Sequence, residues 1–186
     1  EARRNIDDAT WTPPDHGFHL QHWYELRARV ELALYEGDAA AALARLAPAF
    51  AALRRSLLLR VKLVRADAVY LQARLTLAAM HAGHAVARGR DDVARAIAAL
   101  DGEDVGYASV FALLLRAGVA SLGGPAGRDE AARGLARASE LATTLDMAIQ
   151  AAAAQALLGA LRADDAGAAA RAAAAAYVGQ HRIADP

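Results

Sequence analysis

Apolar residues recur along this chain at the spacing of an α-helix, and short polar junctions interrupt the pattern four times. In the first stretch, over residues 18–36, the apolar positions that share one helical face are Trp23, Leu26, Val30 and either Ala33 or Leu34. The same periodicity predicts helices over residues 38–47, 57–87, 91–100, 105–122, 129–145, 146–161 and 167–177. The pattern therefore predicts an all-α protein.

Glycine and aspartate dominate the junctions between these helices. Glycine ends a helix at little cost because it tolerates positive φ, and aspartate opens the next helix by accepting hydrogen bonds from its free N–H groups. The junctions are residues 36–38, 89–92, 127–129 and 164–167. Gly127 follows Gly89 by 38 residues, close to the roughly 34 to 47 residues of two-helix repeats. We therefore expect about four antiparallel helix pairs, stacked as a TPR-like (tetratricopeptide-like) right-handed α-solenoid.

The expected domain organisation is an irregular N-terminal lead-in over residues 1–17, followed by a single helical-repeat domain over residues 18–186. Pro13 and Pro14 would end any helix in the lead-in, and Trp11 is available to pin this segment to the first repeat. Because the chain begins without an initiator methionine, we expect it to be a segment of a longer protein.

Two of the expected helices have distinctive features. Pro48 lacks a backbone N–H and predicts a break near Ala47, in the second helix. The helix over residues 57–87 is apolar on several faces, with residues such as Leu63 and Leu71, and we expect it to be a buried central pillar.

Composition removes several classes of function. The 186 residues include 21 basic and 21 acidic side chains, so the net charge of zero gives no attraction to nucleic acid or to an anionic membrane. The absence of cysteine excludes disulfides and thiolate chemistry and suits a reducing, cytoplasmic compartment. The longest uncharged run, residues 147–161, is shorter than the roughly 20 residues that span a bilayer. We expect a protein or peptide partner and leave the oligomeric state open.

The histidines are the strongest candidates for metal ligands. His16, His19 and His22 recur every third residue, and so do His81 and His84. A metal site needs further ligands at a defined spacing, and no HExxH motif or associated carboxylate accompanies these groups. We expect helix capping and packing for them, with no metal and no cofactor.

Motifs for catalysis are equally absent. The glycine-rich run 123–128 lacks the Lys-Ser/Thr ending of a phosphate-binding loop and follows a helix, so we interpret it as a turn. No nucleophile elbow, His-Arg-Asp or Asp-Phe-Gly motif occurs. We therefore expect no catalytic residue in this segment.

Aromatic and basic residues are the better functional signals. The densest basic run contains Arg54, Arg55, Arg60, Lys62 and Arg65, which favours either an anionic partner or a solvated helix rim, with Asp67 as a possible ion-pair partner. Tyrosine and arginine are enriched among the energetic anchors of interfaces. The candidate partner-binding groove is formed by Tyr24, Arg27, Glu31, Arg60, Tyr70 and Arg74.

Several short runs, in order, carry a resemblance to a known family. They are Gly-Phe-His-Leu-Gln-His-Trp-Tyr at 17–24, Gly-Asp at 37–38, Arg-Ser-Leu-Leu-Leu-Arg-Val at 55–61 with Arg74 downstream, Leu-Arg-Ala-Gly at 115–118, and Ile-Ala-Asp-Pro at 183–186. The chain resembles the C-terminal helical-repeat region of large bacterial serine/threonine protein kinases, in which a kinase domain precedes an ATPase module and tetratricopeptide-like repeats. The resemblance implies a regulatory or scaffolding module of bacterial signalling, and it supplies no catalytic residue.

Two functions follow from these observations. The first is a non-catalytic protein–protein interaction or scaffolding module. Its partner is a protein or peptide, and other domains of the parent protein are among the candidates. The alternative is an effector-sensing domain that binds a small molecule between helices and regulates an attached ATPase or kinase. An open face lined by aromatic and arginine residues favours the first, and a closed apolar pocket favours the second.

Overall fold

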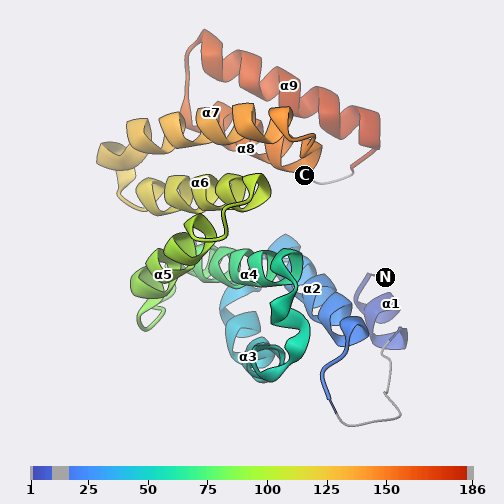
Figure 1. Ribbon diagram of the computed structural model, residues 1–186. Coiled ribbons are helices and arrows are strands. Elements are labelled where there is room, and N and C mark those ends of the chain that lie inside the picture. Colours follow the sequence, from blue (N-terminus) through green and yellow to red (C-terminus); the bar gives the residue numbers. More distant parts are fainter. Residues whose placement is uncertain (1, 10–16, 184–186) are drawn as a thin grey trace. The chain divides into compact units, whose positions relative to one another are not determined.

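The computed structural model describes residues 2–9 and 17–183, and every regular element in these ranges is a helix (Figure 1). The prediction of an all-α protein is confirmed. Residue contacts divide the chain into two compact units, Glu1–Ala96 and Ile97–Pro186. Helix α5, Gly89–Asp101, crosses the boundary between them. The stacking of all helix pairs into a TPR-like solenoid stays a prediction.

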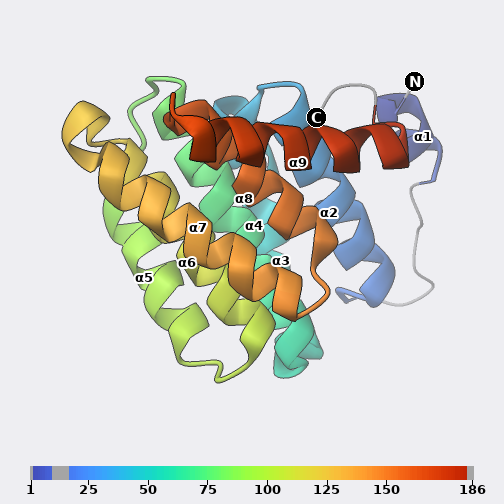
Figure 2. The same cartoon turned by 90° about the horizontal axis from the view of Figure 1, so that it is seen from above.

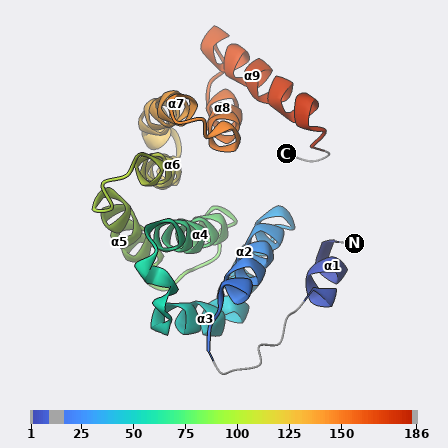
Figure 3. The same ribbon diagram turned by 45° about the vertical axis from the view of Figure 1, so that its right-hand side comes forward.

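The first unit is built around three helices that contact one another. They are α2 (Leu20–Tyr35), α3 (Ala39–Arg55) and α4 (Lys62–His81), with the short 3-10 helix η1 (Leu57–Arg60) between the last two. Gly37, with a φ of 71°, makes the tight turn between α2 and α3 that the sequence predicts. A further short helix, α1 (Ala2–Asp8), lies against α2 on the side away from α4 (Figures 1 and 3).

Large side chains fill the core of this unit. The predicted face of α2 is buried, and Val30 has no exposed surface. The three helices contribute Trp23, Leu26, Val30, Leu46, Phe50, Leu53, Val64, Leu71 and Leu75, among others. Burial of these side chains supplies most of the free energy that holds the helices together, because each is worth about 1.5–3 kcal/mol when removed from water.

The predicted break at Ala47 is wrong. Helix α3 runs without interruption from Ala39 to Arg55 and contains Pro48 in its interior. The buried side chains of Leu46 and Phe50 flank the proline on the core face of the helix. Their packing outweighs the lost backbone hydrogen bond, which alone would favour a break.

The prediction of a buried central helix is correct for part of its length. Leu71, in the middle of α4, is 1% exposed, and ten residues of this helix are buried. Leu63 was expected in the core but is 60% exposed, whereas the adjacent Val64 is 8% exposed and belongs to the core cluster. Consecutive residues of a helix point in directions about 100° apart, and Leu63 lies on the face of α4 that its neighbours leave uncovered.

The N-terminal segment differs from the expected irregular lead-in, since Ala2–Asp8 forms helix α1. Two ion pairs hold this helix on α2, one between Arg3 and Glu36 and one between Asp7 and Arg29. The expected contact of Trp11 and the expected break at residues 13–14 lie outside the described residues.

The second unit is a succession of helices, each packed on the next. It contains α6 (Gly106–Ser121), the 3-10 turn η2 (Gly124–Gly127), α7 (Arg128–Thr144), α8 (Ala148–Leu161) and α9 (Asp165–His181). In Figure 2, α9 lies across α8. Asp164 caps α9 by accepting a hydrogen bond from the backbone N–H of Gly167 at 3.0 Å, as the Asp-rich junction predicts.

Small side chains set the helix spacing in this second unit. Most of its buried positions are alanine, with only a few large residues such as Leu115 and Leu135. A Cβ atom on Gly134 would lie 3.3 Å from the Cβ of Ala117, and one on Gly159 would meet the side chain of Arg171. These helices therefore approach closely because their contact positions carry almost no side-chain volume.

Candidate interaction surface on helices α2 and α4

The candidate groove residues all fall within the first unit. Tyr24, Arg27 and Glu31 lie on α2, and Tyr70 and Arg74 lie on α4, the helix packed against it. The sixth candidate, Arg60, is exposed in η1, and no contact joins it to the other five among the described residues. The fold thus brings most of the predicted set onto two adjacent helices.

Two ion pairs connect these helices. The Arg27 Nε lies 3.5 Å from Asp67 Oδ2, and Arg74 Nη1 donates a hydrogen bond to Glu31 Oε1 at 2.8 Å. The guanidinium carbon of Arg74 also lies 5.3 Å from the centre of the Tyr70 ring, in a cation–π contact. We call Arg27, Glu31, Asp67, Tyr70 and Arg74 the α2–α4 polar cluster.

Burial differs strongly within this cluster. Tyr70 is 9% exposed, and its burial raises the pKa of its phenol to about 12. Burial also raises the pKa of Asp67, although the positive charge of Arg27 opposes this shift. The side chains of Arg27 and Glu31 are 50% and 44% exposed. Arg27 and Glu31 therefore present one polar edge to solvent, while Tyr70 is buried and contacts the Arg74 guanidinium.

Two sequence-based expectations about this cluster need correction. Tyr70 was expected on the exposed groove, but its ring is buried. Asp67 was expected to pair with the basic run of residues 54–65, but it pairs with Arg27 on α2. The spacing of Asp67, Tyr70 and Arg74 at i, i+3 and i+7 places them on one stripe of α4, and this signal predicts that they face a common neighbour.

Tyr24 faces a different neighbour, the N-terminal helix. Its side chain is 57% exposed and borders a hollow of about 470 Å³ between α1 and α2. The other lining residues are Asn5, Ile6, Ala9, Gln21, Glu25 and Ala28. The α1–α2 hollow is mainly apolar, and the two ion pairs between the helices lie on the side of the hollow toward the C-terminal end of α2. The sequence analysis missed the α1 residues because it expected that segment to be irregular.

Two of the candidate histidines, His19 and His22, have a role in helix structure. The backbone N–H of His19, the N-cap of α2, donates to Nδ1 of His22 at 2.9 Å, and the two side chains form a reciprocal capping box. The expectation of helix capping is confirmed for this pair. Within residues 2–9 and 17–183, no group of three or more His, Cys, Asp or Glu side chains is placed to hold a metal ion.

The remaining candidate motifs have simple structural roles. The glycine-rich run 123–128 forms the 3-10 turn η2 and the start of α7, so its interpretation as a turn is confirmed. None of the helices in the described ranges is long and apolar enough to cross a bilayer.

Comparison with known proteins yields no relative: no family model, no curated protein and no solved structure matches this chain. The relationship to bacterial kinase repeat regions stays a prediction from short sequence motifs.

Proposed function

We propose that this chain is a non-catalytic protein–protein interaction module that binds a helix of its partner on the outer face of α2. The observation that carries the proposal is the position of α1. This seven-residue helix lies antiparallel to α2, with Arg3 paired to Glu36 and Asp7 paired to Arg29. A surface that holds so short a helix through two ion pairs beside an apolar hollow has the features of a helix-binding groove.

The side chains of this face are suited to an interface. Tyr24 provides a large ring whose exposed area a partner would cover, and Tyr35, 64% exposed, lies on the same face of α2 three turns later. Arg27 and Glu31 form an adjacent polar edge, already held in place by their ion pairs with α4. A pre-ordered edge lowers the entropy cost of association.

The partner that we favour is a kinase or ATPase domain of the parent polypeptide. This preference rests on the resemblance of short sequence runs to kinase C-terminal repeat regions. Regulation of such a domain by an attached helical module requires binding only, and no chemistry by the module itself.

The small-molecule alternative receives less support from the same geometry. Two hollows lined by described residues of the first unit, the α1–α2 hollow and one where α2 meets the end of α3, are bordered by exposed side chains, Tyr24 in the first and Leu57 in the second. Small-molecule sites typically bury most of their ligand's surface in an enclosed, largely apolar pocket. An open border favours a peptide or a protein surface.

Binding of the separately produced kinase and ATPase portion to this chain, measured by biolayer interferometry, tests the proposal. Tyr24→Ala should weaken the Kd by about 30-fold, the equivalent of about 2 kcal/mol for an interface anchor. The matched control is Ile149→Ala on α8, which removes a side chain of similar exposure, 66%, from the second unit. Unchanged affinity for Tyr24→Ala, or turnover of ATP by the purified chain alone, would refute the proposal.

A further inference from the structure

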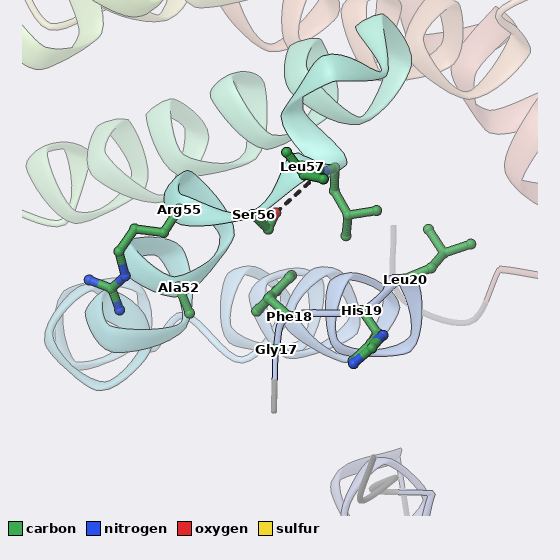
Figure 4. A pocket seen from close by; sticks show the side chains of 9 residues that line it. Gly17, Phe18, His19, Leu20, Ala52, Arg55, Ser56 and Leu57 are labelled. Atoms are coloured by element: carbon green, nitrogen blue, oxygen red, sulfur yellow. Dashed lines mark hydrogen bonds between the residues drawn. The ribbon is translucent and has the colours of Figure 1, made fainter. Parts of the chain in front are cut away.

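A second hollow, distinct from the α1–α2 hollow, lies where the N-terminal end of α2 meets the C-terminal end of α3. Its volume is about 550 Å³, and Figure 4 shows its lining. The walls are formed by Gly17, Phe18, His19, Leu20, Ala52, Arg55, Ser56, Leu57 and Leu58. We call it the α2–α3 hollow. The lining is largely apolar and contains one arginine and no acidic residue.

Local hydrogen bonds hold the walls of this hollow in place. The Ser56 hydroxyl donates to the carbonyl oxygen of Leu53 at 2.8 Å. It also accepts from the backbone N–H of Leu58 at 3.2 Å, the dashed line in Figure 4, and these bonds hold the turn from α3 into η1. Phe18 and Leu58 pack against the core of the unit. The hollow is therefore a feature of the folded unit and needs no rearrangement to form.

Two leucines at the border of the hollow remain in solvent. Leu57 is 69% exposed and Leu20 is 41% exposed. The segment that follows Leu57 adds Val61 at 51% and Leu63 at 60%. An apolar border around an open hollow is typical of a surface that a partner covers.

The stretch of chain that forms one wall of the hollow, between Asp38 and Asp67, carries charge of one sign. No acidic residue occurs between Asp38 and Asp67. Four basic side chains of this stretch are exposed and have no ion pair among the described residues: Arg54, Arg55, Arg60 and Lys62. The other two have local acceptors, since Arg45 pairs with Asp38 and Arg65 donates to the carbonyl oxygen of Leu59 at 2.7 Å. This wall of the hollow is therefore positively charged although the chain is neutral overall.

The geometry points to the α2–α3 hollow as a docking site for an acidic peptide segment that inserts one large apolar side chain. The hollow and its leucine border receive the apolar anchor, and Arg55 with the neighbouring cations receives the flanking carboxylates. A bilayer is the poorer fit, because a flat lipid surface cannot fill a hollow, whereas a protruding side chain can. This site uses different residues from the outer face of α2, so it stands independently of the function proposed above.

Fluorescence anisotropy with a labelled peptide of sequence Glu-Glu-Leu-Leu-Glu-Glu-Leu-Glu-Glu tests the assignment on the full chain. We expect saturable binding whose Kd rises as salt screens the charges. A peptide with glutamine in place of glutamate and one with serine in place of leucine should each bind at least tenfold more weakly. Equal binding of all three peptides would overturn the proposal, because neither charge nor anchor would then be recognised.

Two variants locate the binding on the chain. Arg55→Glu should weaken the Kd of the acidic peptide at least tenfold, and Leu57→Ser at least fivefold. Both side chains are exposed, so their replacement leaves the helical core unchanged, which far-ultraviolet circular dichroism checks. The matched controls are Arg137→Glu on α7 and Ile149→Ser on α8, which make the same kinds of change on exposed helix surfaces and should leave the Kd unchanged.

Two other outcomes would contradict the assignment to the α2–α3 hollow. If Arg137→Glu weakens binding as much as Arg55→Glu, the peptide responds only to net charge and the α2–α3 hollow is not its site. Sedimentation with phosphatidylserine vesicles separates the remaining possibility. Co-sedimentation that Leu57→Ser abolishes, without binding of the acidic peptide, would reassign this surface to a membrane and overturn the peptide assignment.

Discussion

The two units bury their cores with different kinds of side chain. In the first unit, α2, α3 and α4 are held apart by large residues such as Trp23, Phe50 and Leu71. In the second unit the buried positions are mostly alanine, and glycine occurs where neighbouring helices or turns approach closely. Similar amphipathic helices can thus be packed either by filling the space between them or by removing the side chains that would separate them.

Both units also pair charges between helices. In the first unit Arg27 of α2 pairs with Asp67 of α4, and Glu31 of α2 pairs with Arg74 of α4. In the second unit Arg116 of α6 pairs with Asp101 of α5, and Arg162 pairs with Asp164 at the junction before α9. The two units therefore differ in the size of their core side chains and not in the kind of ion pairs that they form.

The large-residue core is tested most directly by Leu71→Ala. This substitution should lower the free energy of unfolding by about 2–5 kcal/mol, because it leaves a cavity among side chains that cannot close around it. Urea unfolding followed at 222 nm provides the measurement. Leu63→Ala, in the same helix but 60% exposed, is the control and should change the free energy of unfolding by less than about 0.5 kcal/mol. Equal effects of the two would mean that α4 is not packed as described.

The close packing of the second unit is tested by adding a single methyl group. Gly167→Ala should destabilise by about 1–3 kcal/mol, because its Cβ would collide with the backbone carbonyl of Arg162. Gly179→Ala in the same helix meets nothing within 4 Å, and it should be neutral or stabilising by up to about 1 kcal/mol because alanine favours the helix. Thermal melts of both variants separate steric cost from helix propensity.

The buried phenol of the first unit predicts a loss of stability in alkali. The pKa of Tyr70 is raised to about 12 in the folded state, so folding favours its protonated form, and this contribution is complete below its ordinary pKa of about 10. It is lost as the pH rises through 12, and the loss at pH 11 is about 1–2 kcal/mol. Tyr70→Phe should reduce the loss measured in urea titrations between pH 9 and pH 11. Tyr24→Phe, on the exposed face, should leave it unchanged, and the reverse result would contradict the burial of Tyr70.

The smallest expected effect concerns the charged start of α9. Hydrogen bonds from Arg162 and from the Gly167 N–H lower the pKa of Asp164 to about 2, so the ionised form stabilises the fold above its ordinary pKa of about 4. This contribution is lost as the pH falls toward 2. Asp164→Ala should therefore lower the Tm at pH 6 and lower it much less at pH 2, where about half of the folded-state carboxyl is protonated. Asp165→Ala, which removes a neighbouring charge that is not the cap, should have the smaller effect at pH 6.

Local sequence signals predicted most of the helices. The buried stripe of α2, the turn at Gly37 and the cap at Asp164 each depend on residues within a few positions of one another, so periodicity and turn chemistry were sufficient. Errors arose where neighbours distant in sequence decide the outcome. Pro48 is tolerated inside α3 because buried residues lie on both sides of it, and Leu63 is exposed because it lies on the uncovered face of α4, although the adjacent Val64 is buried.

The candidate surface shows the same division. Composition and spacing singled out the tyrosines and arginines of α2 and α4, including Tyr24, Arg27 and Arg74. The pairing of Glu31 with Arg74 joins residues 43 positions apart. No local pattern specifies such a pair. Judged by sequence alone, Arg27, one helical turn before Glu31, would be the expected partner of this glutamate.

The amino-acid sequence by itself determined the helices, their buried faces and the residue types available for binding, since these follow from hydrophobic periodicity and side-chain chemistry. Only the tertiary structure decided that Tyr70 is buried while Tyr24 is exposed, which charges pair between helices, and where the α2–α3 hollow opens. These properties depend on the contact of two or three helices at once, and the free energy of such contacts comes from side chains that meet only after folding.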